Sequence, residues 1–148
     1  MKSIKALLTA VLLLVCMGAQ SQSKIKPQTV YIFGFAASYT DSVAFLTDVM
    51  KVDSATILPN GFLAGRALYS LQLENHVTAD KKVMDPTTAI FFSTSLSAAR
   101  KKYEKINTRY QRSTDLALIY VGEDEFRFTS EAYIPDEAFR DTPQKSQK

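Results

Sequence analysis

The segment of residues 29–36 constrains the fold of this chain most, because it is apolar on both of its faces. Its sequence, Thr-Val-Tyr-Ile-Phe-Gly-Phe-Ala, is rich in β-branched and aromatic residues. Consecutive side chains of a strand point to opposite faces of a sheet, so apolar residues at both parities are typical of a strand buried on two sides. The segment therefore predicts an inner strand rather than an edge strand.

The N-terminal segment has the layout of a secretory signal peptide. Lys2 and Lys5 precede the charge-free, Leu-rich run of residues 6–17, and small residues follow it. The run is shorter than the roughly 20 residues that a membrane-spanning helix needs. We therefore expect residues 1–21 to be removed and the protein to be exported to the periplasm or the medium.

Two alternatives stay open at this N-terminus. Cleavage after Ser21 places the small residue Ala19 at the minus-three position, whereas cleavage after Ala19 places Met17 there. Lipidation of Cys16 would tether the protein to a membrane, but Val15 precedes that cysteine where lipoprotein signals carry Gly, Ala or Ser. The prediction is export without a lipid anchor, and membrane contact is expected only if Cys16 is lipidated.

Charge and cysteine content limit the classes of function. Once Lys2 and Lys5 leave with the signal, 16 Lys and Arg face 15 Asp and Glu, a net charge of +1. A near-neutral domain without a basic tail argues against a nucleic acid as partner. Cys16 is the only cysteine, so the exported chain lacks thiolates and depends on a hydrophobic core.

Residues 22–134 are predicted to form one α+β domain, and residues 135–148 a disordered tail.

Hydrophobic periodicity predicts seven elements in the order strand, strand, helix, strand, helix, strand, strand. They cover residues 29–36, 42–52, 62–77, 87–94, 95–111, 115–121 and 125–133. The second segment also has helical spacing behind the potential cap Asp41, but strand is favoured. Within 62–77, Tyr69, Leu71 and Leu73 alternate as in a strand, whereas the Leu, Ala, Gln and Glu content favours the helix that we predict.

The connections between these elements predict the architecture. The first two strands form an antiparallel hairpin, and the last two form another around the solvated acidic turn of residues 123–125. The strands at 87–94 and 115–121 are joined by a helix and are expected to run parallel. The fold class is therefore α+β, a two-layer sandwich with both helices on one face of a mixed, mostly antiparallel sheet of about five strands (ββαβαββ).

Residues suited to catalysis are few. His76 is the only histidine and lies near Glu74, but residues two apart on a helix do not face each other. Asp48 interrupts an apolar run, and we interpret it as the solvent face of a strand. Nucleophile elbows, glycine-rich phosphate loops and zinc ligand sets are absent from the sequence. Asp48, Glu74 and His76 are the weak catalytic candidates, and neither a cofactor nor a metal is expected.

The predicted helix 95–111 and the residue after it carry the densest cluster of one charge. Its proposed anion-contacting residues are Lys101, Lys102, Lys105, Arg109 and Arg112, with Arg100 beside them. Charge runs of this kind are mostly the solvated face of an amphipathic helix. As a functional surface, the cluster fits an anionic partner.

Several short runs between residues 29 and 131 carry a resemblance to a known group of proteins. They are Val30-Tyr31-Ile32-Phe33-Gly34-Phe35, Asp41-Ser42-Val43, Val52-Asp53-Ser54, Gln72-Leu73, Ala89-Ile90-Phe91-Phe92 and Lys101-Lys102-Tyr103. In these runs the chain resembles small uncharacterised secreted proteins of the Bacteroidota, a family without assigned activity. The resemblance implies a periplasmic or secreted setting. It also implies O-glycosylation of Ser42 and Ser54, each in an Asp-Ser-apolar triplet.

Together these features favour an exported, non-enzymatic module that contacts an envelope or extracellular protein or glycan through a sheet edge or a helix face. No nucleic acid is expected as a partner. One alternative is a small periplasmic hydrolase that works with carboxylates. Another is a secreted enzyme inhibitor, for which the loops at residues 53–61 and 78–86 would have to protrude.

Overall fold

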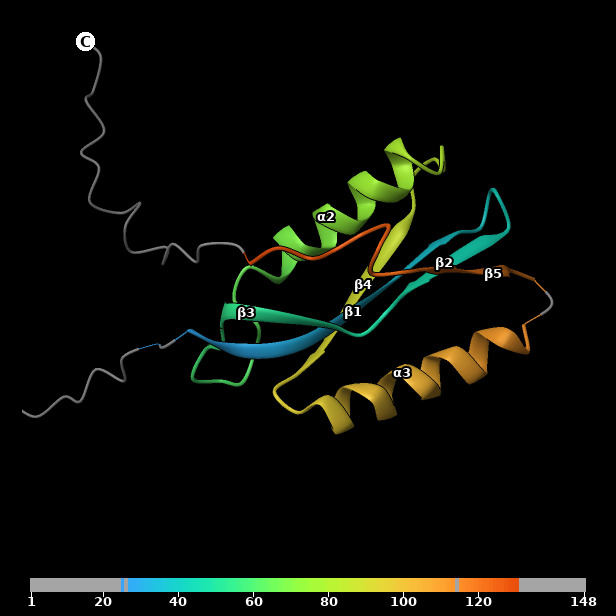
Figure 1. Ribbon diagram of the computed structural model, residues 1–148. Coiled ribbons are helices and arrows are strands. Elements are labelled where there is room, and N and C mark those ends of the chain that lie inside the picture. Colours follow the sequence, from blue (N-terminus) through green and yellow to red (C-terminus); the bar gives the residue numbers. More distant parts are fainter. Residues whose placement is uncertain (1–24, 26, 114, 131–148) are drawn as a thin grey trace, which may run out of the picture.

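The computed structural model describes residue 25, residues 27–113 and residues 115–130. In chain order these form β1 (Pro27–Ser38), β2 (Val43–Thr47), β3 (Met50–Thr56), α2 (Arg66–Ala79), β4 (Thr87–Ser93), α3 (Leu96–Gln111) and β5 (Ala117–Val121) (Figure 1). The predicted signal and tail, residues 1–21 and 135–148, lie outside the described residues. Neither helix in the described part is long and apolar enough to cross a membrane.

All five strands belong to one mixed sheet. β1 pairs antiparallel with β4 along one edge and, in succession, with β2 and β3 along the other. β5 then adds to β2 in parallel. The predicted α+β class, the mixed and mostly antiparallel sheet, the first hairpin and the helix over 62–77 are confirmed. β4 and β5 also run in the same direction, as predicted, although β1 and β2 lie between them.

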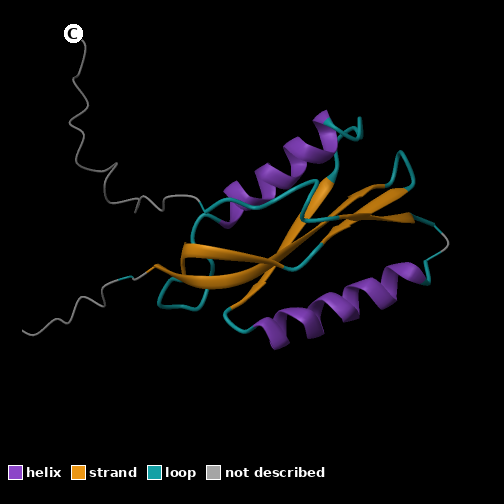
Figure 2. Cartoon of the chain, in the orientation of Figure 1, coloured by secondary structure: helices purple, strands orange, loops and turns teal. Residues whose placement is uncertain are grey.

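The two helices cover opposite faces of the sheet, so the prediction of a two-layer sandwich with both helices on one face is wrong (Figures 1 and 2). On one face α2 buries Tyr69, Leu73 and Val77 in the larger core. On the other face Tyr103 and Tyr110 of α3 pack against the second core.

Strand direction supplies the physical reason for this correction. β3 and β4 run in the same direction, as do β4 and β5, so each helix is a crossover between like-directed strands. The chain moves across β1 in one direction through α2 and returns in the other through α3. Because crossovers of this kind are right-handed, two that run in opposite directions place their helices on opposite faces.

The chain after β5 does not continue as the predicted second hairpin, since no strand follows β5 within residues 122–130. This segment instead runs beside α2 (Figure 1). The Gln72 side chain accepts a hydrogen bond from Thr129 N–H at 3.0 Å and donates one to Thr129 C=O at 3.1 Å. Phe126 and Phe128 pack against the larger core, where their burial stabilises the fold more than exposure on a free hairpin would.

The predicted single strand 42–52 is divided into β2 and β3 where the register with β1 shifts. Phe35 lies opposite Leu46, and Ile32 lies opposite Met50. Three residue steps on β1 therefore face four on the β2–β3 segment, which contains one extra residue at the break. At this break the backbone N–H of Gly34 donates to Thr47 Oγ1 at 2.9 Å. The fully buried Thr47 hydroxyl thus replaces a backbone acceptor.

Replacing Thr47 by Val should destabilise the protein by about 1–3 kcal/mol, because the buried N–H of Gly34 would lose its acceptor while the side-chain volume stays nearly constant. Thr47→Ser, which keeps the hydroxyl, should retain most of the stability. The free energy of unfolding from urea titration measures both variants. Equal stability of Thr47→Val and the wild type would show that the side-chain acceptor is dispensable.

Candidate functional site

The three candidate catalytic residues have separate surroundings. Asp48 Oδ2 accepts a hydrogen bond from Glu123 N–H at 3.1 Å, which holds the turn that follows β5. Glu74 is exposed on α2. His76 points inward, with only 8% of its side chain exposed. No contact among the described residues joins Asp48, Glu74 and His76 to one another.

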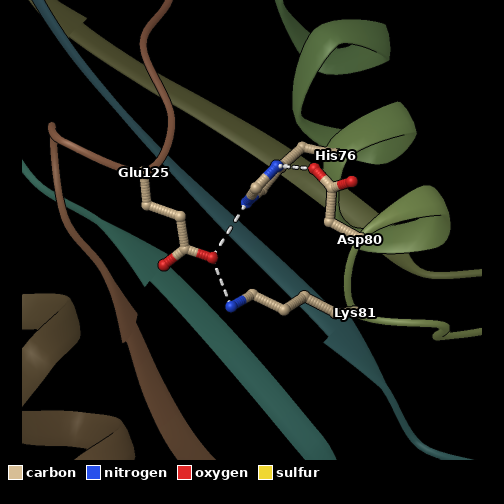
Figure 3. Close-up of polar contacts among 4 residues, drawn as sticks. All are labelled: His76, Asp80, Lys81 and Glu125. Atoms are coloured by element: carbon tan, nitrogen blue, oxygen red, sulfur yellow. Dashed lines mark ion pairs between the residues drawn. The ribbon is translucent and has the colours of Figure 1, made fainter.

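His76 belongs instead to a cluster of four polar residues at the C-terminal end of α2 (Figure 3). Its Nδ1 lies 2.7 Å from Oδ2 of Asp80, the C-cap residue of α2, and its Nε2 lies 3.6 Å from Glu125 Oε1. Lys81 forms an ion pair with the same Glu125 oxygen. The cluster therefore joins α2 to the segment that follows β5.

The contacts of this cluster support a structural role, because its four residues interact with one another. A carboxylate only accepts hydrogen bonds, so the contact with Asp80 places a proton on His76 Nδ1. Nε2 is buried without a hydrogen-bond partner in the described residues, and the ring stacks on Phe126 with centroids 5.0 Å apart. A general base must reach the proton that it abstracts. The enclosed imidazole touches two carboxylates and an aromatic ring, none of which is a nucleophile that it would activate.

The sequence did not reveal Asp80 and Glu125 as partners of His76, or Lys81 as the partner of Glu125. The spacing of His76 and Asp80 is i and i+4, which places both on one side of a helix and was a usable signal. Glu125 lies in an exposed acidic turn, as predicted, and in addition forms an ion pair with Lys81. No sequence spacing indicates that contact, because the fold brings it about.

The outer face of α3 presents the predicted basic cluster to solvent. All six cations of the cluster are exposed, namely Arg100, Lys101, Lys102, Lys105, Arg109 and Arg112. In the part of the chain that the structure describes, none of them forms an ion pair with an acid. Lys102 donates instead to Phe92 C=O at 2.9 Å and lies 5.9 Å from the centroid of the Phe92 ring. This charge is therefore available to an anionic partner.

The inner face of α3 is fixed against the sheet and β5. Tyr103 meets Phe33 edge-on with ring centroids 5.5 Å apart, and Tyr110 packs on Phe35 at 4.3 Å. The Tyr120 hydroxyl donates to the side chain of Asn107 of α3 at 2.7 Å. These contacts hold the helix in one orientation, so the basic face keeps its direction.

Tyr103 should make the protein less stable at alkaline pH. Burial, and next the negative charge of Asp48, raise the pKa of Tyr103 above its ordinary value of 10.0. The unfolded chain therefore releases this proton first, and the contribution to stability is complete below about pH 10 and lost as the pH rises through the folded-state pKa. Urea titrations over this range should show a shallower decline for Tyr103→Phe than for the wild type. The exposed Tyr39→Phe is the control, and equal declines in all three proteins would contradict this assignment.

The two predicted glycosylation residues share a local geometry. Ser42 and Ser54 are both exposed, and their φ angles of 54° and 62° are in the left-handed region. Asp53, which precedes Ser54, accepts a hydrogen bond from Thr29 Oγ1 at 2.6 Å. This hydrogen bond is the largest cause that lowers the pKa of Asp53, and the hydrogen bond from Lys51 is the next. Exposure is what an attached glycan requires, and the modification itself stays a prediction.

The described residues contain no group of three or more His, Cys, Asp or Glu arranged to hold a metal ion. Comparison with known proteins adds no assignment: no family model matches the chain, and no curated protein or solved structure is significantly similar to it. The surface and charge of the molecule are therefore the remaining guide to its function.

Proposed function

We propose that this chain is an exported, non-enzymatic binding module that contacts an anionic component of the cell envelope through the outer face of α3. The charge distribution carries this proposal. Residues 27–130 contain 11 Lys and Arg and 11 Asp and Glu, yet α3 with its C-cap Arg112 holds six of the cations and a single acid, Glu104. The helix thus has a charge of +5 and the remainder −5. Segregated charge attracts and orients a partner of opposite sign.

Cationic side chains of both helices argue against the β4 edge of the sheet as the contact surface. The outer edge of β4 is covered from both helices, because Arg66 Nη2 of α2 donates to Ile90 C=O at 2.6 Å and Lys102 Nζ of α3 donates to Phe92 C=O at 2.9 Å. Long cationic side chains at an edge hinder the addition of another strand. Strand addition at β4 is therefore disfavoured, whereas the outer face of α3 is open.

Replacing Lys101, Lys105 and Arg112 together by Gln should weaken sedimentation of the purified protein with insoluble envelope material by about tenfold at low salt. The physical reason is that each removed cation eliminates one released counterion from the binding equilibrium, so the salt dependence should also become shallower. The measurement is the bound fraction as a function of salt concentration.

The control is the matched triple substitution of Lys51, Lys82 and Arg127 by Gln, which changes the net charge by the same amount outside α3. This variant should bind like the wild type. Equal binding by the α3 variant and the wild type would refute the proposed contact surface. Turnover by the wild type on a panel of ester, peptide and glycosidic substrates would favour the hydrolase alternative.

A further inference from the structure

We infer that the partner of the α3 basic face is a linear acidic polysaccharide, an inference that rests on the proposed function and specifies its ligand. The exposed cations form a stripe rather than a scattered set. Lys101, Lys105 and Arg112 are separated by four and seven residues, spacings that return to the same side of an α-helix. At 1.5 Å per residue the stripe extends over about 16 Å. A straight row of charges on a rigid helix matches an extended polymer with repeated anionic groups.

A folded protein is a poorer fit to this surface. Stable protein interfaces are organised around aromatic and aliphatic anchors that enter pockets. In the described part of the chain, the large hydrophobic residues that are exposed all lie outside α3. The aromatic residues of α3 face the sheet, as the contact of Tyr103 with Phe33 shows. The outer face therefore offers charge without a hydrophobic anchor.

A lipid bilayer is disfavoured for a related reason. A helix that binds in the plane of a membrane inserts an apolar face between the headgroups and keeps its cations at the sides. The apolar face of α3 is occupied by the sheet, and Asn107 and Gln111 are hydrogen bonded to Tyr120 of β5. The helix cannot turn this face to a membrane without leaving its core.

The remaining charge of the domain favours a single polymer chain along the stripe. The −5 outside α3 repels any polyanion that extends around the molecule, so binding is confined to one face. Proteins that bind single-stranded nucleic acids add aromatic platforms on which the bases stack, and the outer face of α3 presents no aromatic side chain. A polysaccharide with one anionic group per unit requires only the cations.

The test measures binding of the purified full chain to three defined probes: polygalacturonate, vesicles of phosphatidylglycerol and phosphatidylcholine in equal parts, and a deoxythymidine homopolymer. The wild type should bind polygalacturonate most tightly. The triple Gln variant of Lys101, Lys105 and Arg112 should bind it about tenfold more weakly with a lower salt slope. The triple variant of Lys51, Lys82 and Arg127 should bind like the wild type.

Tighter binding to the vesicles or to the deoxythymidine homopolymer than to polygalacturonate would overturn the inference. It would also fail if polygalacturonate bound the α3 variant and the wild type equally. Failure here is distinguishable from failure of the proposed function, which is judged on envelope sedimentation. If sedimentation depends on α3 but polygalacturonate does not bind, the contact surface stands and the polysaccharide is rejected.

Discussion

Gly34→Ala is expected to destabilise the protein by about 1–3 kcal/mol, although the same change in an uncrowded strand would stabilise it. A Cβ at Gly34 would lie 2.5 Å from Leu73 Cδ2 and 3.1 Å from Phe128 Cζ. Leu73 is fully buried, so its side chain has little freedom to withdraw. The absence of a side chain at Gly34 thus lets α2 and the segment after β5 approach the centre of β1. The measurement is the free energy of unfolding from urea titration.

The matched control places Gly34→Ala in a Leu73→Ala background. Leu73→Ala alone creates a cavity and should cost about 2–5 kcal/mol. Adding Gly34→Ala should then be nearly neutral, because the clashing methyl is gone and the new Cβ fills part of the space. The double variant should therefore be more stable than the sum of the two single destabilisations predicts. If Gly34→Ala stabilised the wild-type protein, the close packing of α2 on β1 would be wrong.

Phe128→Ala should destabilise the protein by about 3–5 kcal/mol, the usual cost of removing a buried aromatic side chain. Phe128 is 4% exposed and lies in the larger core, where its ring meets Tyr69 and Phe126 at angles of 65° and 83°. The expected loss of stability is large because Phe128 is part of the core, although it lies after the last strand. Thermal unfolding monitored by circular dichroism should show a strongly lowered Tm.

Phe62→Ala is the matched control for Phe128→Ala, since it removes the same side chain from a position that is 57% exposed. It should leave the Tm nearly unchanged. If the two variants behaved alike, the segment after β5 would not belong to the core. The result therefore separates the observed packing beside α2 from the hairpin that the sequence pattern predicts.

Local signals in the sequence predicted the helices well, because these signals arise within a single element. The Leu, Ala, Gln and Glu content of residues 62–77 identified α2, whose Tyr69, Leu73 and Val77 are buried. The predicted helix 95–111 corresponds to α3, which is capped by Ser95, whose side chain accepts from Ala98 N–H at 3.4 Å. Periodicity and capping report the conformation of a segment directly, because both arise from neighbours along the chain.

The candidate site was predicted in part. The basic cluster of α3 followed from the helical pattern, and its exposure agrees with that pattern. The surroundings of His76 did not follow, because Glu125 reaches it only after the chain has passed through β5 and turned back beside α2. The Asp48 contact with Glu123 N–H is of the same kind. Both join segments that no local spacing relates.

The sequence by itself determined that β1 is apolar on both faces and needs a cover on each. It also determined the order of helices and strands through β5, except for the division of residues 42–52 into β2 and β3, and the side of α3 that stays in water. Only the tertiary structure decided which element supplies each cover: α2 with Phe126 and Phe128 on one face, and α3 on the other. The physical reason is that periodicity shows which faces must be buried, whereas crossover direction and close approach at Gly34 select what buries them.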